Sequence, residues 1–299
     1  MQTPRPRYRG RFAPTPSGPL HLGSLLTALA SWLAARNTGG AWLLRIDDLD
    51  RARCPRGTDA VILRQLEAHG LEWDESPRYQ ALHLDEYREA LDRLQRAARL
   101  YACACSRGAL RESALAGPDG PAYPGTCRDA GLASTRRALR ARLPDREACF
   151  DDAWQGRQCR ALRREVGDFV VRRADGQPSY QLACALDEDA QAVTDVVRGA
   201  DLLGSTFCQR WLQQQLGLTA PRHAHLPVLT DARGRKLSKQ NHAPAVDARA
   251  AARNLRHCLA LLGQPGPGAG SPGAMLRAAA AQWDAALVPR TAQIVHLPL

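Results

Sequence analysis

The alternation of strand and helix patterns in the first part of the chain restricts the fold more than any other feature. Residues 8–13 are typical of a short strand running into a proline-rich turn, and residues 24–36 carry apolar side chains at helical spacing. A mostly apolar run follows at 42–46, and further helical patterns fill 59–69 and 84–99. Because each helix returns the chain to the same end of the sheet, such strands pair in parallel. We therefore predict an α/β fold with a parallel sheet and crossover helices.

The alternation stops after residue 100. Residues 101–165 combine several cysteines, a Gly/Pro loop at 117–121 and an arginine-rich stretch at 136–146, which suits an inserted subdomain. Beyond it, residues 168–173 and 180–186 resemble the two strands of a hairpin. The alternation then resumes with a strand at 193–197 and a helix at 205–216. Two further helices are expected near the end of the chain, at 248–262 and 273–286.

The charge balance points to a polyanionic partner. The 41 basic and 30 acidic residues give a net charge of +11. We favour nucleic acid over a membrane, because no basic amphipathic helix with a bulky apolar face stands out. Many arginine-rich proteins are basic without binding an anion, so charge alone does not decide this.

Cysteine usage and the absence of targeting patterns bear on the compartment. No run of eighteen apolar residues is present, and residues 1–11 are basic and proline-rich, unlike a secretory signal. The nine cysteines are an odd number scattered through a long chain. We therefore expect reduced thiols in the cytoplasm, and any cysteine cluster is more readily a metal site than a disulfide frame.

Only two of the 41 basic residues are lysines, and both lie in one short motif, at Lys236 and Lys239. A lysine is a compact charge that can follow one phosphate oxygen, whereas arginine offers a planar fork. The pair therefore marks a position that needs a point charge, unless it sits by chance in a solvated loop.

The turn between the first strand and first helix is a second candidate site. Backbone N–H groups and the helix dipole attract anions there, Gly18 and Gly23 allow close approach, and His21 adds a side-chain donor. Neither a Walker A motif nor a G-x-G-x-x-G motif is present, so those nucleotide-binding modes are excluded. A proline-rich turn with a surface histidine is the alternative.

Together these motifs resemble a known family. His21-Leu22-Gly23-Ser24 and Lys236-Leu237-Ser238-Lys239-Gln240 resemble the paired signatures of class I aminoacyl-tRNA synthetases. Three further segments, 11–18, 44–50 and 197–203, are similar to glutamyl-tRNA synthetases. The resemblance covers roughly residues 8–245 and stops where those enzymes continue into an anticodon-binding region. The chain is therefore most similar to the glutamyl-queuosine tRNA(Asp) synthetases.

The resemblance implies a domain organisation. Residues 1–229 would form a Rossmann-like catalytic domain, in which the insertion at about 101–165 is a zinc-binding, acceptor-type subdomain. Residues 230–299 would carry the lysine-motif loop and a short helical region like the stem-contact part of the family, with no anticodon-binding domain.

The resemblance also implies a glutamate site. Arg11 would read a carboxylate with its bidentate fork, and Asp47 would face the substrate ammonium. Glutamate is usual at the position of Asp47, so the shorter side chain is a departure. The expected glutamate-binding residues are Arg11, Phe12, Ala13, Pro14, Thr15, Asp47, Tyr180 and Arg198. From the residues alone, Tyr180 could equally be a strand aromatic and Arg198 a surface charge.

For the nucleotide, the resemblance assigns catalytic roles to His21, Lys236 and Lys239, and an ATP site to His21, Gly23, Ser24 and Lys239. Lys239 would neutralise charge that develops on the α-phosphate, with Lys236 in support. Ser24 stands where the superfamily more often has histidine. Mg²⁺ would be bound mainly by the ATP phosphates, without a protein ligand.

A metal site is expected in the insertion. Cys103, Cys105, Tyr123 and Cys127 resemble the family's structural zinc site, with one ion per chain. Thiolates suit Zn²⁺, although Cys-x-Cys is a tight bite and a phenolate is a rare ligand, so unliganded thiols are the alternative. The remaining cysteines show no ligand spacing, and we interpret them as core or incidental residues: Cys54, Cys149, Cys159, Cys184, Cys208 and Cys258.

These features favour an enzyme that activates L-glutamate with ATP, without tRNA, and transfers it to queuosine at the wobble position of tRNA(Asp). We expect a cytoplasmic monomer. Three alternatives stay open: a truncated glutamyl-tRNA synthetase that charges a 3′ end, a non-catalytic tRNA-binding paralogue, and a small-molecule adenylyl- or cytidylyltransferase.

Overall fold

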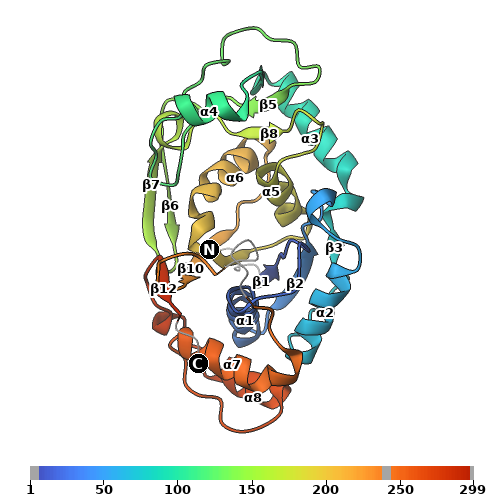
Figure 1. Ribbon diagram of the computed structural model, residues 1–299, viewed down its shortest axis with the longest axis vertical. Helices are drawn as coiled ribbons and strands as arrows, with labels where there is room; N and C mark the ends of the chain where they lie inside the picture. Colours follow the sequence, from blue (N-terminus) through green and yellow to red (C-terminus); the bar gives the residue numbers. More distant parts are fainter. Residues whose placement is uncertain (1–6, 238–243, 297–299) are drawn as a thin grey trace, which may run out of the picture.

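A mostly parallel sheet forms the centre of the molecule (Figure 1). The structure, a computed structural model, describes residues 7–237 and 244–296. The sheet has seven strands in the order β3-β2-β1-β9-β10-β6-β7, and only β7 pairs antiparallel with its neighbour. The strands are β1 (Arg9–Phe12), β2 (Ala41–Ile46), β3 (Arg78–Tyr79), β6 (Glu147–Asp152), β7 (Gly156–Ala161), β9 (Asp195–Gly199) and β10 (Arg222–Leu226). The prediction of an α/β fold on a parallel sheet is confirmed.

Helix α1 (Leu22–Asn37) connects β1 to β2 and is enclosed on most sides. Leu25, Leu29 and Leu33 have no exposed surface and belong to the largest apolar core. The C-terminal helices α7 (Ala251–Leu261) and α8 (Pro272–Ala281) pack on α1 and contribute to the same core (Figure 1). The other long helices are α2 (Thr58–Ala68), α3 (Leu84–Arg96), α5 (Tyr180–Ala190) and α6 (Leu203–Leu216). In the part of the chain that is described, no helix is long and apolar enough to cross a membrane.

The segment after residue 180 is a helix, so the predicted hairpin is wrong in its second half. Residues 168–173 do contain a strand, β8 (Val170–Arg172), but α5 begins at Tyr180. The Ser179 hydroxyl caps this helix by accepting a hydrogen bond from the Leu182 backbone N–H at 3.3 Å. The apolar run behind it contains no β-branched residue, and it buries Leu182 and its neighbours against α6.

The residues between 100 and 165 contribute to two different sheets. β4 (Leu100–Cys103), β5 (Ala138–Ala141) and β8 form a separate antiparallel sheet, with α4 (Arg107–Ser113) beside it at the top of Figure 1. β6 and β7 instead extend the central sheet, where His223 of β10 lies opposite Asp152. Two further strands, β11 (Val228–Thr230) and β12 (Gln293–Val295), form a short parallel pair.

A disulfide joins Cys149 and Cys159, which corrects the expectation of reduced thiols for this pair. The two residues lie directly opposite one another on β6 and β7, with Cα atoms 4.2 Å apart. Antiparallel neighbours bring their Cβ atoms within reach of such a bond. The sequence did not predict this disulfide because the hairpin of β6 and β7 was not recognised. The other seven cysteines form no disulfide in the described part of the chain.

Candidate active site

A cavity of about 450 Å³ opens at the carboxyl ends of β1 and β9. Open α/β sheets place ligands at this edge, where the loops after parallel strands meet. The predicted site residues that line the cavity are Arg11, Phe12, Ala13, Pro14, Thr15, His21, Gly23, Ser24, Tyr180, Arg198 and Lys236. The fold therefore brings residues from four distant segments of the chain to one cavity.

The two sequence motifs meet at the start of α1. A Cβ placed on Gly23 would lie 3.8 Å from the Leu237 carbonyl oxygen, so Leu237, which follows Lys236, lies beside the first helical turn. On the far side of that motif, the Val246 N–H donates to the Leu20 carbonyl at 2.9 Å. The Gln65 side chain contacts both Leu20 and Val246. It accepts a hydrogen bond from the Leu20 N–H at 2.8 Å and donates one to the Val246 carbonyl at 3.0 Å. The predicted residue Lys239 lies outside the described residues.

His21 occupies the N-cap of α1. Its Nδ1 accepts the Ser24 backbone N–H at 3.3 Å, and its Nε2 lies 3.0 Å from the Ser24 hydroxyl. The imidazole is thereby held beside the first turn of a helix that has no acidic residue there. This end of the cavity is suited to anions, because the N–H groups and the dipole of α1 favour negative charge.

Lys236 supplies a cation at the same end. Its Nζ lies 2.6 Å from an Asp201 carboxylate oxygen, and its side chain is 45% exposed. Asp201 belongs to the single helical turn that follows β9, Ala200–Leu202. The pair links the lysine motif to the strand that carries Arg198.

Two arginines that line the cavity are almost fully buried. Arg11 donates to Glu188 Oε1 at 3.1 Å and to the Val197 carbonyl at 3.2 Å. Arg198 donates to groups on α6 and β10 and to the Leu202 carbonyl. Both residues are 3% exposed, so interior partners fix their side chains before any ligand arrives.

Asp47 differs from the other predicted glutamate-site residues because it does not line the cavity. Its carboxylate accepts from Arg45 Nε at 2.7 Å inside the protein, beside Cys184. Burial raises the pKa of the Asp47 carboxyl above its usual value, and the Arg45 guanidinium opposes that rise only in part. Arg45 also lies 3.7 Å from Asp187, so Asp47 belongs to a buried ion network.

The sequence-based predictions missed the buried ionisable residues that support the cavity. They are Arg45, Asp152, Asp187, Glu188 and His225, all buried. For Arg45 the signal was a charged residue within an otherwise apolar strand, Leu-Leu-Arg-Ile at 43–46. Buried charges need partners, but the partners come from other elements and no local spacing identifies them.

The predicted metal ligands form one cluster. The Sγ atoms of Cys103, Cys105 and Cys127 lie within 4.8 Å of one another, and those of Cys105 and Cys127 are 3.5 Å apart. The Tyr123 hydroxyl lies 3.5 Å from Cys103 Sγ and 3.4 Å from Cys105 Sγ. Sulfur atoms around tetrahedral Zn²⁺ are separated by about 3.8 Å, given Zn–S bonds near 2.3 Å. The donor set and its spacing fit a metal ion.

Within the cluster, the surroundings of Cys103 favour a thiolate, whereas the pKa of Cys105 is raised. Burial opposes ionisation of Cys103, but hydrogen bonding with Tyr123 and Arg140 outweighs it and lowers the pKa of this thiol to about 7. The Arg140 guanidinium lies 3.8 Å from the centre of the Tyr123 ring, on which it stacks. Gly167, at φ +72°, packs against the Tyr123 backbone, where a Cβ would lie 2.5 Å from its nitrogen. Any side chain at 167 would displace Tyr123.

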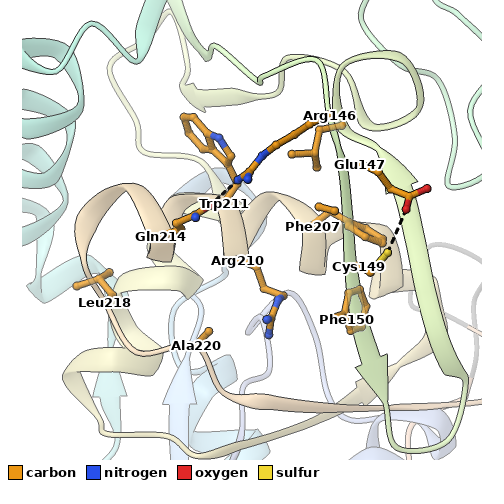
Figure 2. A pocket seen from close by; sticks show the side chains of 12 residues that line it. Arg146, Glu147, Cys149, Phe150, Phe207, Arg210, Trp211, Gln214, Leu218 and Ala220 are labelled. Carbon is orange, nitrogen blue, oxygen red and sulfur yellow. Dashed lines mark hydrogen bonds between the residues drawn. The ribbon is translucent and has the colours of Figure 1, made fainter.

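A second cavity, of about 430 Å³, lies between β6 and α6 (Figure 2). Three aromatic residues, Phe150, Phe207 and Trp211, contribute to its walls. Arg146 donates a hydrogen bond across it to Gln214 at 2.9 Å. The Arg210 guanidinium lies 5.9 Å from the Phe150 ring centre. None of the predicted site residues in the described ranges lines this cavity.

The chain matches the family model described as the catalytic domain of class I tRNA synthetases for E and Q, over residues 7–255. It is 52% identical over 260 residues to a protein of Ralstonia nicotianae named glutamyl-Q tRNA(Asp) synthetase, covering 82% of this chain and 81% of that one. A protein of Chromobacterium violaceum with the same name is 50% identical over 295 residues, covering 98% of both chains.

Among solved structures, the chain resembles a glutamate-tRNA synthetase of Elizabethkingia anophelis with a TM-score of 0.80. The sequences are 23% identical, and the match covers 98% of this chain and 68% of the other. At this identity the likeness establishes the fold alone.

Proposed function

Because this chain belongs to the family of class I glutamyl- and glutaminyl-tRNA synthetase catalytic domains, and within it to the glutamyl-Q tRNA(Asp) synthetases, we propose that it transfers L-glutamate to queuosine in tRNA(Asp). The enzyme would first activate glutamate with ATP, in the absence of tRNA. The observation that carries the proposal is the single cavity lined by Arg11, His21, Tyr180, Arg198 and Lys236.

The buried arginines of this cavity suit the amino-acid end of the reaction. Arg11 and Arg198 present fixed positive charge to a carboxylate, and Phe12, Ala13, Pro14, Thr15 and Tyr180 would form the rest of the glutamate pocket. For Asp47 to meet the substrate ammonium, its carboxylate would have to exchange part of its pairing with Arg45 for the ligand. Its role in this pocket is therefore conditional on that exchange.

The start of α1 and the lysine motif suit the phosphate end. The glutamate carboxylate would attack the α-phosphorus of ATP, a new O–P bond would form, and the bond to pyrophosphate would break. His21, Gly23 and Ser24 would contact the phosphates, and Lys236 and Lys239 would stabilise the charge that develops. Mg²⁺ would arrive with ATP and remain bound mainly to its phosphates.

The cysteine cluster supports a structural role for zinc. Cys103, Cys105, Tyr123 and Cys127 would close the coordination shell and leave no position for a substrate. The ion would connect the end of β4 to the loop before β5 and so stabilise the small antiparallel sheet. We assign glutamate activation to residues 1–229, with residues 230–299 supplying the lysine motif and part of the core around α1.

The proposed acceptor is the queuosine at the wobble position of tRNA(Asp). Its cyclopentene diol resembles the ribose diol that related synthetases esterify, and the net charge of +11 suits a polyanion. The proposed partners are thus ATP, L-glutamate and queuosine-containing tRNA(Asp), and we propose that the enzyme acts as a cytoplasmic monomer.

The acceptor can be tested directly. Labelled glutamate and ATP are incubated with tRNA(Asp) that contains queuosine, and in parallel with the same tRNA carrying guanine at that position. We expect label only in the first, and nuclease digestion should recover it on the wobble nucleotide. Equal labelling of both, or label on the 3′-terminal adenosine, would instead identify a truncated glutamyl-tRNA synthetase.

A further inference from the structure

The protein itself occupies most of the hydrogen-bonding capacity of Arg198. Its Nε donates to His225 at 3.0 Å and its Nη1 to Gln209 at 2.8 Å. Its Nη2 donates to Thr206 at 2.8 Å and to the Leu202 carbonyl at 3.3 Å. A guanidinium has five N–H donors, so these four bonds leave one for a ligand in the cavity. The direction of that last N–H depends on how the other four are held.

The bond to His225 fixes the tautomer of this histidine. Because Arg198 Nε is always a donor, His225 Nε2 must be the acceptor and its proton must be on Nδ1. Nδ1 lies 2.5 Å from Asp152 Oδ2, which accepts that proton. Burial lowers the pKa of His225 although the hydrogen bond to Asp152 opposes that shift, and the Arg198 charge lowers it further. The imidazole is therefore neutral and oriented.

Asp152 is itself held by the backbone. Its Oδ1 accepts the N–H groups of Trp154, Gln155 and His225 at 3.1, 3.0 and 3.0 Å, which leaves Oδ2 for the imidazole. Asp152 and His225 are buried, and Asp152 ends β6, whereas Arg198 lies on β9. The chain of contacts thus runs from the edge hairpin of the sheet to the cavity.

We propose that Asp152 and His225 are positioning residues that aim the guanidinium of Arg198 at the carboxylate of the amino-acid substrate. This rests on the proposed function, in which Arg198 binds glutamate. Neither residue lines the cavity, so both act through Arg198. If the histidine proton were on Nε2, two N–H groups would face each other, and Arg198 would have to turn away.

Asp152→Asn is the sharpest variant, because the two carboxylate oxygens have separate tasks. The amide oxygen can replace Oδ1 and keep the three backbone bonds, while the NH₂ group replaces Oδ2 and donates to Nδ1. The proton of His225 is then forced onto Nε2, against Arg198. We expect the KM for glutamate in ATP–pyrophosphate exchange to rise about ten- to a hundredfold, with kcat and the KM for ATP changed less than threefold.

The matched control is Asp151→Asn on the same strand, since Asp151 is exposed and its carboxylate pairs with Arg157 at 3.5 Å. It should behave as wild type. Nitrogen-15 NMR of the imidazole should report Nδ1–H in wild type and Nε2–H in the Asp152→Asn protein. Calorimetric titration with glutamate, without tRNA, should show the same loss of affinity.

Several results would overturn the proposal. One is a folded Asp152→Asn protein with an unchanged KM for glutamate; another is an equal rise in both KM values, which indicates general damage. If this variant does not fold, His225→Gln and His225→Asn replace it. Glutamine can offer an acceptor near the position of Nε2, whereas asparagine reaches only the position of Nδ1, so the glutamine variant should bind glutamate better. Equal affinities would refute the positioning role. Wild-type protein without glutamate-dependent exchange would overturn the proposed function as well.

Discussion

The proposed amino-acid and phosphate ends of the cavity are built in different ways. At the amino-acid end, Arg198 is 3% exposed and gives four hydrogen bonds to interior groups. At the phosphate end, the side chain of Lys236 is 45% exposed and pairs with Asp201 near the surface. A small amino acid must be distinguished from others of similar size, which requires donors fixed in direction. Phosphate oxygens can instead be met by charges on flexible stems.

The largest effect is expected from the phosphate end. Lys239→Ala should lower the rate of glutamate-dependent ATP–pyrophosphate exchange roughly a hundred- to a thousandfold, because a contact made mainly in the transition state is lost. Glutamate affinity, measured by calorimetry, should change only a few-fold. Lys239→Arg should restore part of the rate. An exchange rate near that of wild type in the alanine variant would remove this lysine from the chemistry.

A smaller effect of the opposite kind is expected from the amino-acid end. Arg198→Lys should raise the KM for glutamate about ten- to a hundredfold while kcat stays within a few-fold, because one ammonium cannot reproduce the four bonds of the fork. Arg222→Lys is the control, since Arg222 is an exposed residue on β10 that pairs with Asp195. If Arg198→Lys lowered kcat without changing the KM for glutamate, Arg198 would act in the chemical step and not in glutamate binding.

Acid should lower the stability of the fold through two buried histidines, His223 and His225. Burial lowers the pKa of His223 and of His225 below the ordinary value near 6.5, so the folded protein excludes protons that the unfolded chain binds. The stability that each contributes is present above about pH 6.5 and is lost as the pH falls, by up to about 1.4 kcal/mol per pH unit. Urea unfolding at pH 7.5 and 5.5 should show this loss.

A single substitution separates the contribution of His223. Neither ring nitrogen of His223 has a hydrogen-bond partner in the described part of the chain, so His223→Phe should keep the stability at pH 7.5. The same variant should be less sensitive to acid than wild type. If the two proteins lose stability in parallel between the two pH values, His223 is not a source of the acid sensitivity.

The smallest effect on exchange is expected from the metal cluster, which belongs to neither end. Cys105→Ser should reduce zinc content, measured by elemental analysis, from about one ion per chain, and it should destabilise the sheet of β4, β5 and β8. Exchange without tRNA should remain within about twofold of wild type. Ser106→Ala, at the adjacent cap of α4, is the control. Wild-type protein that is folded, active and metal-free would contradict a structural role for zinc.

The sequence predicted regular elements better than interior contacts. The helices around 24–36 and 205–216 were found because their apolar residues repeat at helical spacing over three turns or more. The helix at Tyr180 was missed, since a short apolar run fits either a strand or a helix, and its capping residue Ser179 was not given weight. Motifs likewise predicted half of the residues that line the cavity.

The partners of those residues could not be predicted, because they come from elements far away in the chain. Asp152 of β6 holds His225 of β10, and Arg45 of β2 holds Asp47 close to Asp187 of α5. The resemblance assigned Asp47 to the ammonium from its place in a motif. The pairing with Arg45 depends on how β2 meets α5, which no motif encodes.

The packing of α7 and α8 on α1 bears on where the protein can be cut. Leu255, Leu259 and Leu276 are almost fully buried in the core that contains α1, and Asn37 at the end of α1 donates to the Ala280 carbonyl at 3.0 Å. A gene truncated after Leu237 would leave an apolar face of α1 in water, at about 25 cal/mol for each Å² uncovered. Since α1 holds Gly23 and is capped by His21, both of which we propose contact the nucleotide, a minimal catalytic fragment should keep these terminal helices, and fusion partners are better joined beyond them.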